Sequence, residues 1–376
     1  MVKFIHSSDL HLAKPFGRFE EDLRGRLREA RHEKIAEMAK IARDRGANIV
    51  LLAGDTFDAE TPLPQVVRHA VRALGAENDI TWVILPGNHD SLAAGDLWER
   101  MTREKPQNVI LALSAEPILV GNDLVILPAP PTSRNPGRDL TEWMDDATLS
   151  ESCNSRIRVG LAHGSIQNFG EGDALGIIPP DRPARAGLDY LALGDWHGRI
   201  RVGSRCWYSG TPESDNFKNP EQAGVLLVEI AARGAEPCVE VIPTSSFTWS
   251  EVEADFRAGD DIGDRLSHEL PDLASRRKTL MIFRGTGRLS LAERAHLNAS
   301  LAEAVDDFSF FEADLQSLVI EQQAGDLDEI DTGGALRAAA ESIAKDGSNA
   351  ALSEDDRKIA SAALARLYDY AAEVRS

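Results

Sequence analysis

The sequence predicts an α/β fold, and two observations support that prediction. Short apolar runs with the length and composition of β-strands recur through residues 1–245, with helical stretches between some of them. Five of these runs end directly in polar, ionisable residues. Because α/β sheets place their sites at the carboxyl ends of strands, where the connecting loops converge, we expect these ionisable residues to share one site.

The strands of this first part follow from the runs, taken in order. The five runs with polar ends are residues 2–5 before Asp9, 48–53 before Asp55, 82–85 before Asn88, His89 and Asp90, 158–162 before His163, and 190–193 before Asp195 and His197. Further runs predict strands at residues 111–120 and 123–127. Residues 225–230 and 238–242 are typical of a closing hairpin.

Two helices are predicted between the first strands. Residues 20–45 place Leu23, Leu27, Met38 and Ile41 broadly on one face, and Gly46 can end this helix. A second helix is expected over about residues 63–74. Together with the strands, these helices predict an alternating α/β arrangement.

The pattern changes after about Thr244. Strands are predicted at residues 279–283 and 315–320, and helices at 291–305 and 335–344. A last helix begins at Ser353, with Asp356 placed to cap it. On this helix an apolar stripe is formed by Ile359, Ala363, Leu367, Tyr370 and Val374. The stripe either packs on its own domain or docks a partner.

Length and composition limit the classes of protein. The 376 residues suit two or three domains, and 43% hydrophobic with 27% charged residues allows a packed core. The net charge of −20, of which −12 lies from Ser246 onward, argues against binding DNA by bulk charge. Metal ions can still supply positive charge at a local site. The acidic second part is expected to face solvent or a partner.

Cysteine spacing and apolar run length exclude other classes. Cys153, Cys206 and Cys238 form no CxxC pair, so neither a zinc knuckle nor a disulfide framework is indicated. The first residues do not resemble a signal peptide. Apolar runs stay below the roughly 18 residues of a membrane span. We therefore expect a cytoplasmic protein without membrane association.

The strand-end residues have the composition of a two-metal site. Hydrolysis of a phosphodiester needs an activated water, neutralised phosphoryl oxygens and help for the leaving group, and two divalent ions roughly 3.5–4 Å apart supply all three. Such a site requires a bridging carboxylate with mixed histidine and oxygen ligands. A single Asp-x-His or Gly-Asp would be an ordinary turn, and a lone histidine is more often structural than a ligand. Five matches in order favour the metal site.

The ordered set resembles the calcineurin-like metallophosphoesterase signature D-x-H, G-D, G-N-H-D, H and G-H-x-H. Within that superfamily, residues 5–12 (Ile-His-Ser-Ser-Asp-Leu-His-Leu) and 208–213 (Tyr-Ser-Gly-Thr-Pro-Glu) are similar to SbcD-type and YhaO-like DNA repair nucleases. The resemblance covers about residues 1–245. It implies a metallophosphoesterase β-sandwich flanked by helices at 1–245, a smaller α+β capping domain at 246–325, and C-terminal helices at 326–376.

The resemblance also implies a role for each matching residue. The first ion would be held by Asp9, His11, Asp55 and His197. The second would be held by Asp55, which bridges, and by Asn88, His163 and Asp195. His89 would protonate or stabilise the leaving oxygen, and Asp90 would orient its loop. The cofactors implied are two divalent ions, with Mn²⁺ preferred and Mg²⁺ as the alternative.

Two positions depart from the nuclease pattern. Asp195 stands where the family commonly has histidine; it either ligates directly, favouring manganese or magnesium, or contacts the metal through water. Asp58 stands where related nucleases often carry histidine. Its carboxylate is expected to hydrogen bond to His89 and raise the pKa of that imidazole, unless Asp58 is simply a surface turn residue.

Three functions remain open at this point. The first is a manganese-dependent DNA exo- or endonuclease in DNA repair, which the resemblance associates with an SMC-like ATPase partner and a homodimer. The second is a phosphodiesterase of cyclic nucleotides or other small diesters, and the third is a weakly active scaffold subunit. Candidate DNA contacts are Arg134, Arg138, Arg182, Arg185, Arg199, Arg201, Arg205, Trp196, Phe16 and Phe217. The alternative for each arginine is a solvated surface position, and for each aromatic residue a packing role.

Overall fold

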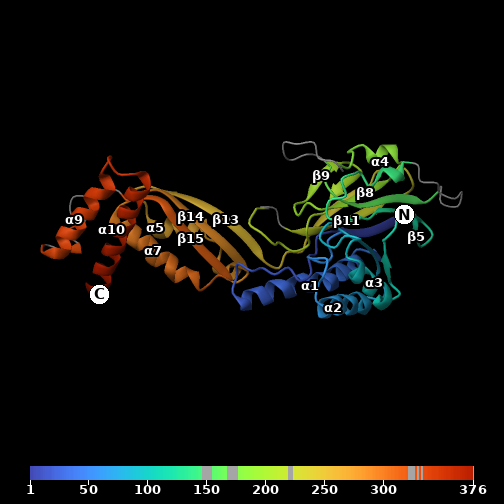
Figure 1. Cartoon of the computed structure of the whole chain (residues 1–376), viewed down its shortest axis with the longest axis horizontal. Helices are drawn as coiled ribbons and strands as arrows, with labels where there is room; N and C mark the ends of the chain where they lie inside the picture. Colours follow the sequence, from blue (N-terminus) through green and yellow to red (C-terminus); the bar gives the residue numbers. More distant parts are fainter. Residues whose placement is uncertain are drawn as a thin grey trace. The chain divides into compact units, whose positions relative to one another are not determined.

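The computed structural model describes residues 1–145, 155–166, 177–218, 223–320, 327, 330–331 and 333–375. The chain divides into two compact units, Met1–Phe247 and Thr248–Ser376, and each is described by itself (Figure 1). The expected three-part division stays a prediction, because its second boundary, between residues 325 and 326, lies outside the described residues.

Two six-stranded sheets form the first unit. The first sheet has the order β12-β11-β1-β2-β3-β4, and the second has the order β5-β6-β7-β8-β10-β9. The strands of the first sheet are β12 (Cys238–Pro243), β11 (Gly224–Ile230), β1 (Val2–Ser7), β2 (Ile49–Ala53), β3 (Thr81–Leu85) and β4 (Val109–Leu111). Those of the second are β5 (Ile118–Val120), β6 (Leu124–Ala129), β7 (Ile157–His163), β8 (Tyr190–Gly194), β10 (Cys206–Tyr208) and β9 (Ile200–Gly203).

The two sheets pack face to face over an apolar layer. Phe4, Leu51, Val83 and Leu161 meet there, with Tyr190, and all five side chains are fully buried. Helices α1 (Glu21–Asp44), α2 (Pro64–Ala76) and α3 (Gly95–Glu104) cover the outer face of the first sheet and lie together in Figure 1. The short α4 (Arg182–Arg185) and the 3-10 helix η1 (Glu142–Met144) belong to the other side. The predicted α/β sandwich with flanking helices is confirmed.

Strand direction brings the polar ends together. β1, β2 and β3 are neighbouring parallel strands in the first sheet. β7 and β8 are neighbouring parallel strands in the second. The residues that follow these five strands therefore emerge at the same end of the sandwich.

The predicted strand over residues 111–120 is wrong. The structure has two short strands instead, since β4 pairs with β3 and β5 pairs with β6 in the other sheet. Between them runs the segment Ser114-Ala115-Glu116-Pro117, whose proline cannot donate to a strand ladder. Two further features were not predicted from the sequence, namely the β9–β10 pair and helix α3, which buries Leu97, Trp98 and Met101.

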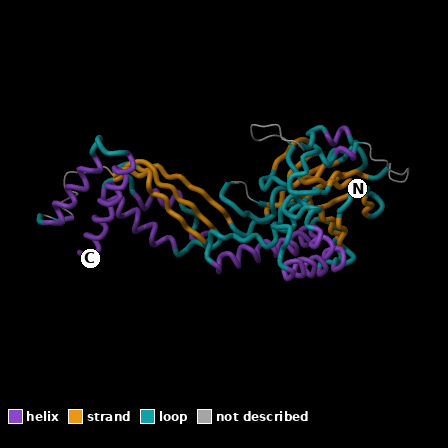
Figure 2. Tube along the Cα trace, viewed as in Figure 1, coloured by secondary structure: helices purple, strands orange, loops and turns teal. Residues whose placement is uncertain are grey.

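The second unit is built on a three-stranded parallel sheet. Its strands are β13 (Thr248–Phe256), β14 (Thr279–Leu289) and β15 (Phe310–Ile320), which Figure 2 shows side by side. Helices α5 (Ile262–Glu269) and α7 (Leu291–Val305) contribute Leu266, Leu297 and Leu301 to the core on one face, and α6 (Leu273–Arg276) lies between β13 and β14 in the chain. β13 was not predicted from the sequence, and β14 and β15 were predicted only in part. A capping box of Ser290 and Glu293 begins α7.

The last two helices are α9 (Ala335–Ser348) and α10 (Glu354–Arg375), and they pack on each other. The packed face of α10 consists of Leu364, Ala365, Tyr368 and Ala371, which are buried. The predicted stripe lies mostly elsewhere: Ile359 is 67%, Tyr370 51% and Val374 88% exposed. Packing on its own domain is therefore the wrong interpretation for these three residues.

One buried ion pair anchors the end of the first unit. Lys34 on α1 is 1% exposed, and its Nζ lies 3.0 Å from Oε2 of Glu213 and 2.7 Å from Oγ of Ser246. The Glu213 carboxylate also accepts hydrogen bonds from the backbone N–H groups of Ser246 (2.7 Å) and Phe247 (3.0 Å). The pair thus holds α1 to the segment with which this unit ends.

We expect Lys34→Met to lower the free energy of unfolding by roughly 3–5 kcal/mol, because it leaves the Glu213 carboxylate buried without its cation. Urea unfolding followed by circular dichroism measures this. Lys40→Met is the matched control, since Lys40 is exposed on the same helix and pairs with Asp44 at the surface. Equal losses in the two variants would contradict the anchoring role.

Candidate metal centre

Loops after five strands deliver the candidate ligands to one place. Asp9 and His11 follow β1, Asp55 follows β2, and Asn88, His89 and Asp90 follow β3; His163 ends β7, and Asp195 and His197 follow β8. Asp9 is 0%, His11 1%, Asp55 2% and His163 6% exposed. These nine of the ten site residues predicted from the sequence therefore lie at one end of the sandwich.

Unusual backbone conformations mark these loops. Asp9, His11, Asp55 and Asp195 have φ angles of 55°, 42°, 52° and 104°, a region that residues other than glycine seldom adopt. Close approach is also required: a Cβ on Gly87 would lie 2.0 Å from Oδ1 of Asp55. Strain of this kind is concentrated at functional sites, where the surrounding structure must hold it in place.

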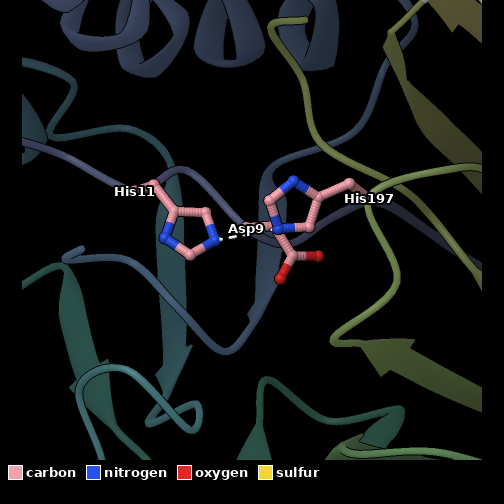
Figure 3. Close-up of side chains that lie close together, drawn as sticks. All are labelled: Asp9, His11 and His197. Atoms are coloured by element: carbon pink, nitrogen blue, oxygen red, sulfur yellow. Dashed lines mark hydrogen bonds between the residues drawn. The ribbon is translucent and has the colours of Figure 1, made fainter. Parts of the chain in front are cut away.

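The first cluster consists of Asp9, His11 and His197, whose potential ligand atoms lie within 4.8 Å of one another (Figure 3). Nδ1 of His197 donates to the carboxylate of Asp215 (2.9 Å to Oδ2), and Nδ1 of His11 lies 3.1 Å from Oδ1 of Asp58. The two Nε2 atoms then face each other at 3.1 Å. Two imidazole lone pairs repel at this distance, so a proton or a metal cation has to lie between or beside them.

The second cluster consists of Asp9, Asp55 and His163. Nδ1 of His163 donates to the carbonyl oxygen of Ala53 (2.8 Å), which leaves Nε2 buried and without a hydrogen-bond partner among the described residues. That atom lies 3.6 Å from Oδ2 of Asp55 and 3.7 Å from Oδ1 of Asp195. Nδ2 of Asn88 donates to the same oxygen of Asp195 (3.1 Å).

Asp55, a member of the second cluster, also lies beside the first. Its Oδ2 is 3.6 Å from Nε2 of His11 and 3.6 Å from Nε2 of His163. Its Oδ1 accepts the backbone N–H of His89 at 2.8 Å, which fixes the carboxylate. A carboxylate in this position can touch an ion on either side, as a bridging ligand must.

Electrostatics also favour a cation here. Burial opposes a charge on His163, but Asp55, Asp9 and Asp195 outweigh it and raise its pKa to about 9. Burial, with repulsion from Asp55, raises the pKa of Asp90 to about 7. Burial is the main cause of a raised pKa at Asp195, with repulsion from Asp9 and Asp55 as smaller causes. The site thus holds more buried negative charge than its own side chains offset.

His89 and Asp58 are arranged differently from the expectation. Nδ1 of His89 donates to the backbone carbonyl oxygen of Asp58 (3.0 Å), while the Asp58 carboxylate faces His11. The expected hydrogen bond between the Asp58 carboxylate and His89 is therefore wrong, because the turn directs the side chain to the other histidine. Asp90 accepts the N–H groups of Gly87 (2.6 Å) and Phe57 (2.9 Å) and so ties the two loops together.

Several residues of the site were not predicted from the sequence. Asp215 accepts from His197, and Lys14 (2.5 Å) binds its Oδ2. Arg31 donates to backbone oxygens of Asp9 and Leu10. For Asp215, the adjacent Tyr-Ser-Gly-Thr-Pro-Glu segment was a signal; for Arg31, which lies within a helix, the sequence offers none.

The candidate DNA contacts are divided by their environment. Arg182 is 1% exposed and pairs with Asp139 and Asp145, and Arg185 and Arg205 pair with Asp145 and Asp189. Arg201 stacks on Trp207, and Arg199 is partly buried, whereas Arg134 and Arg138 are exposed.

The aromatic candidates differ in exposure. Trp196 is 43% and Phe16 7% exposed, and Phe217 is partly buried beneath Arg18. Trp196 is thus the aromatic candidate best placed to meet a substrate.

Residues 2–225 match the model of the family described as calcineurin-like phosphoesterase. The chain belongs to this family. Calcineurin-like phosphoesterases are metal-dependent hydrolases that use a pair of divalent ions. Of the three groups of potential ligands that the described residues form, the third being His11, Asp58 and His89, the two clusters above share Asp9 and fit such a pair. Nε2 of His163, buried and without a hydrogen-bond partner among the described residues, fits it as well.

Two curated relatives from Bacillus subtilis are similar to this calcineurin-like phosphoesterase. YhaO, named an uncharacterized metallophosphoesterase, is 26% identical over 242 residues, which cover 61% of this chain and 57% of YhaO. The SbcD subunit of the nuclease SbcCD is 24% identical over 290 residues, which cover 67% of this chain and 69% of that protein. The match therefore spans little more than half the length of YhaO.

Solved structures give weaker likenesses. A Thermus thermophilus protein aligns with a TM-score of 0.39 at 10% identity, over 65% of this chain and 99% of its own. A dimetal phosphatase from Danio rerio aligns with a TM-score of 0.38 at 12% identity, over the same shares of 65% and 99%. Likenesses at this level add nothing to the family match.

In the described part of the chain, none of the helices has the length and apolar character needed to cross a membrane.

The shared carboxylate predicts unequal effects of two substitutions. We expect the chelator-treated protein to take up about two Mn²⁺ ions per chain. His163→Ala should weaken mainly one of the two binding steps, and Asp55→Ala should weaken both, because Asp55 adjoins both clusters. Isothermal titration with Mn²⁺ measures this, with the exposed His268→Ala as control. Loss of a single step in Asp55→Ala would show that the carboxylate is not shared.

Proposed function

We propose that the protein is a two-metal phosphodiesterase that cuts DNA, with manganese as the preferred ion and magnesium as the alternative. The observation that carries the proposal is the position of Asp55 between two clusters of histidine and oxygen donors. In this proposal the first ion is held by Asp9, His11, Asp55 and His197. The second is held by Asp55, Asn88, His163 and Asp195.

The donor set supports the choice of ion. Carboxylate, amide and imidazole groups suit manganese, and the two carboxylates at the second position, Asp55 and Asp195, favour a hard cation. Asp195 keeps this character where a second histidine at that ion would soften it. Its carboxylate is 30% exposed and already bound to Asn88, which leaves direct or water-mediated contact with an ion equally compatible with the geometry.

His89 is the proposed proton donor. When bound, the ions supply an activated water and neutralise the phosphoryl oxygens. The backbone N–H of His89 is fixed on Asp55, and its Nδ1–H is fixed on the Asp58 carbonyl oxygen. That leaves Nε2 to donate a proton to the leaving oxygen, while the carbonyl dipole stabilises the cationic imidazolium. Asp90 keeps the loop in place, and Asp58 acts on His11.

Three features support DNA as the substrate. One of the relatives is named as part of a nuclease. Trp196 exposes its indole ring between two proposed ligands, where a base could stack on it. A pocket of about 600 Å³ is lined by Leu12 and Asp58 beside the site and by Arg28 of α1 and His69 of α2, which gives a nucleic-acid strand room beside the site.

A second function is favoured by charge. The net charge of −20 suits a small diester, such as a cyclic nucleotide, better than a long polyanion. A weakly active scaffold subunit is a third, and Asp195 in place of a histidine is its support. The set of potential ligands lying together weighs against the scaffold, and the three features above favour DNA over a small diester.

The nuclease proposal is tested with labelled single- and double-stranded DNA in Mn²⁺, beside a cyclic nucleotide. We expect DNA cleavage to require the ion and His89→Ala to lower it roughly 10²–10⁴-fold without loss of bound metal. His268→Ala, in the second unit, should cut like the unmodified protein. Turnover of the cyclic nucleotide without DNA cleavage would move the assignment to small diesters, and metal binding without either activity would support the scaffold.

We further propose a cytoplasmic role in DNA repair with an SMC-like ATPase partner and a homodimer of this chain. The exposed Ile359 and Val374 on α10 offer the ATPase an apolar docking face. The dimer stays an analogy with related nucleases.

For the docking face, we expect Ile359→Glu to lower ATPase binding at least about tenfold, because a charge would be buried at an apolar contact. Hydrolysis of bis(p-nitrophenyl) phosphate should be unchanged. Lys358→Glu, at the neighbouring exposed position, is the control for charge alone. Normal binding by Ile359→Glu would remove α10 from the interface.

A further inference from the structure

Asp215 is a buried carboxylate behind one of the proposed ligands. Its side chain is 1% exposed and accepts a hydrogen bond from Nδ1 of His197, which lies 2.9 Å from Oδ2 and 3.1 Å from Oδ1. Nζ of Lys14 reaches the same Oδ2 at 2.5 Å, and Nδ2 of Asn216 reaches Oδ1 at 2.7 Å. Nη1 of Arg31 lies 3.9 Å from Oδ2. The carboxylate thus has two cationic neighbours, Lys14 and Arg31, and the imidazole of His197.

Arg31 joins the segment of Asp215 to the loop after β1. Its guanidinium is 1% exposed and donates to the carbonyl oxygens of Leu10 (2.5 Å), Asp9 (2.7 Å) and Glu213 (3.0 Å). It also donates to Oγ1 of Thr211 at 3.0 Å. One side chain from α1 therefore holds the backbone of a proposed ligand, Asp9, in register with the segment that carries Asp215.

These contacts restrain the imidazole ring of His197. A hydrogen bond from Nδ1–H to a carboxylate fixes the tautomer, so that Nε2 carries the lone pair, and fixes the rotation of the ring. It also makes the imidazole a stronger donor to a metal. His197 is only partly buried, and it follows a loop that contains a residue with a φ of 104°, so its own backbone offers little restraint.

We propose that Asp215 is the positioning residue of the His197 ligand, and that Arg31 sets the Asp215 segment against the Asp9 loop. Asp215 acts through the imidazole and does not touch substrate. Its role rests on the proposed function, in which His197 is a metal ligand.

If Asp215 served folding alone, its substitution would lower the melting temperature and leave Mn²⁺ affinity unchanged. Asp189 is also a fully buried carboxylate of the first unit, and it pairs with Arg233 (2.8 Å) and the N–H of Gly234 (2.7 Å) without touching a proposed ligand. Asp189→Asn is therefore the matched control. It should lower the melting temperature of the protein but leave Mn²⁺ affinity unchanged.

The test is a titration of Mn²⁺ into the chelator-treated full chain, measured by isothermal titration calorimetry. We expect Asp215→Asn to weaken one binding step by roughly 10–100-fold. His197→Ala should weaken the same step at least as much. Normal affinity in Asp215→Asn beside weakened His197→Ala would overturn the inference alone. Normal affinity in His197→Ala would instead overturn the ligand assignment.

A second measurement does not depend on the folding of any Asp215 variant. Nitrogen-15 spectra of the metal-free protein, labelled at histidine, report the tautomer of each neutral imidazole. We expect His197 to carry its proton on Nδ1. A proton on Nε2 would overturn the proposal.

Discussion

Buried negative charge is the constraint on which the rest of the site depends. Asp9, Asp55 and Asp90 are almost completely removed from water, and Asp195 is close by. A buried carboxylate is costly unless it is paired with a cation or hydrogen bonded. Asp90 is satisfied by two backbone N–H groups, but Asp55 uses one oxygen on His89 and directs the other toward two imidazoles. Divalent ions at this position would remove the imbalance.

The fold supplies the restraint that such a site needs. Parallel strands at the centres of two sheets bring five loops to one end, and glycines allow the loops to approach each other. Positive φ angles at four proposed ligands are held by contacts from elsewhere, and Arg31 on Asp9 is one of these. Asp215 restrains the ring of His197 in the same way. The proposed ligands Asp9 and His197 are therefore held by residues outside the two clusters.

The sequence was sufficient to predict that the candidate residues meet at one site, because they lie at the ends of five strands and a strand end is a local signal. It was insufficient where the contacts join distant segments. Arg31 and Glu213 meet across 182 positions, and the Asp58 carboxylate turns to His11 instead of His89. The strand predicted over residues 111–120 failed for a similar reason, since its two halves pair with different sheets. Apolar content alone did not reveal β13, whose alternate residues Glu251, Glu253 and Asp255 face solvent.

The central claim is that two divalent ions lie on opposite sides of Asp55. Crystals grown with Mn²⁺ and measured near the manganese absorption edge test it directly. We predict two anomalous peaks, one beside His11 and His197 and the other beside His163 and Asn88, with the Asp55 carboxylate between them. A single peak, or two peaks on the same side of Asp55, would contradict it.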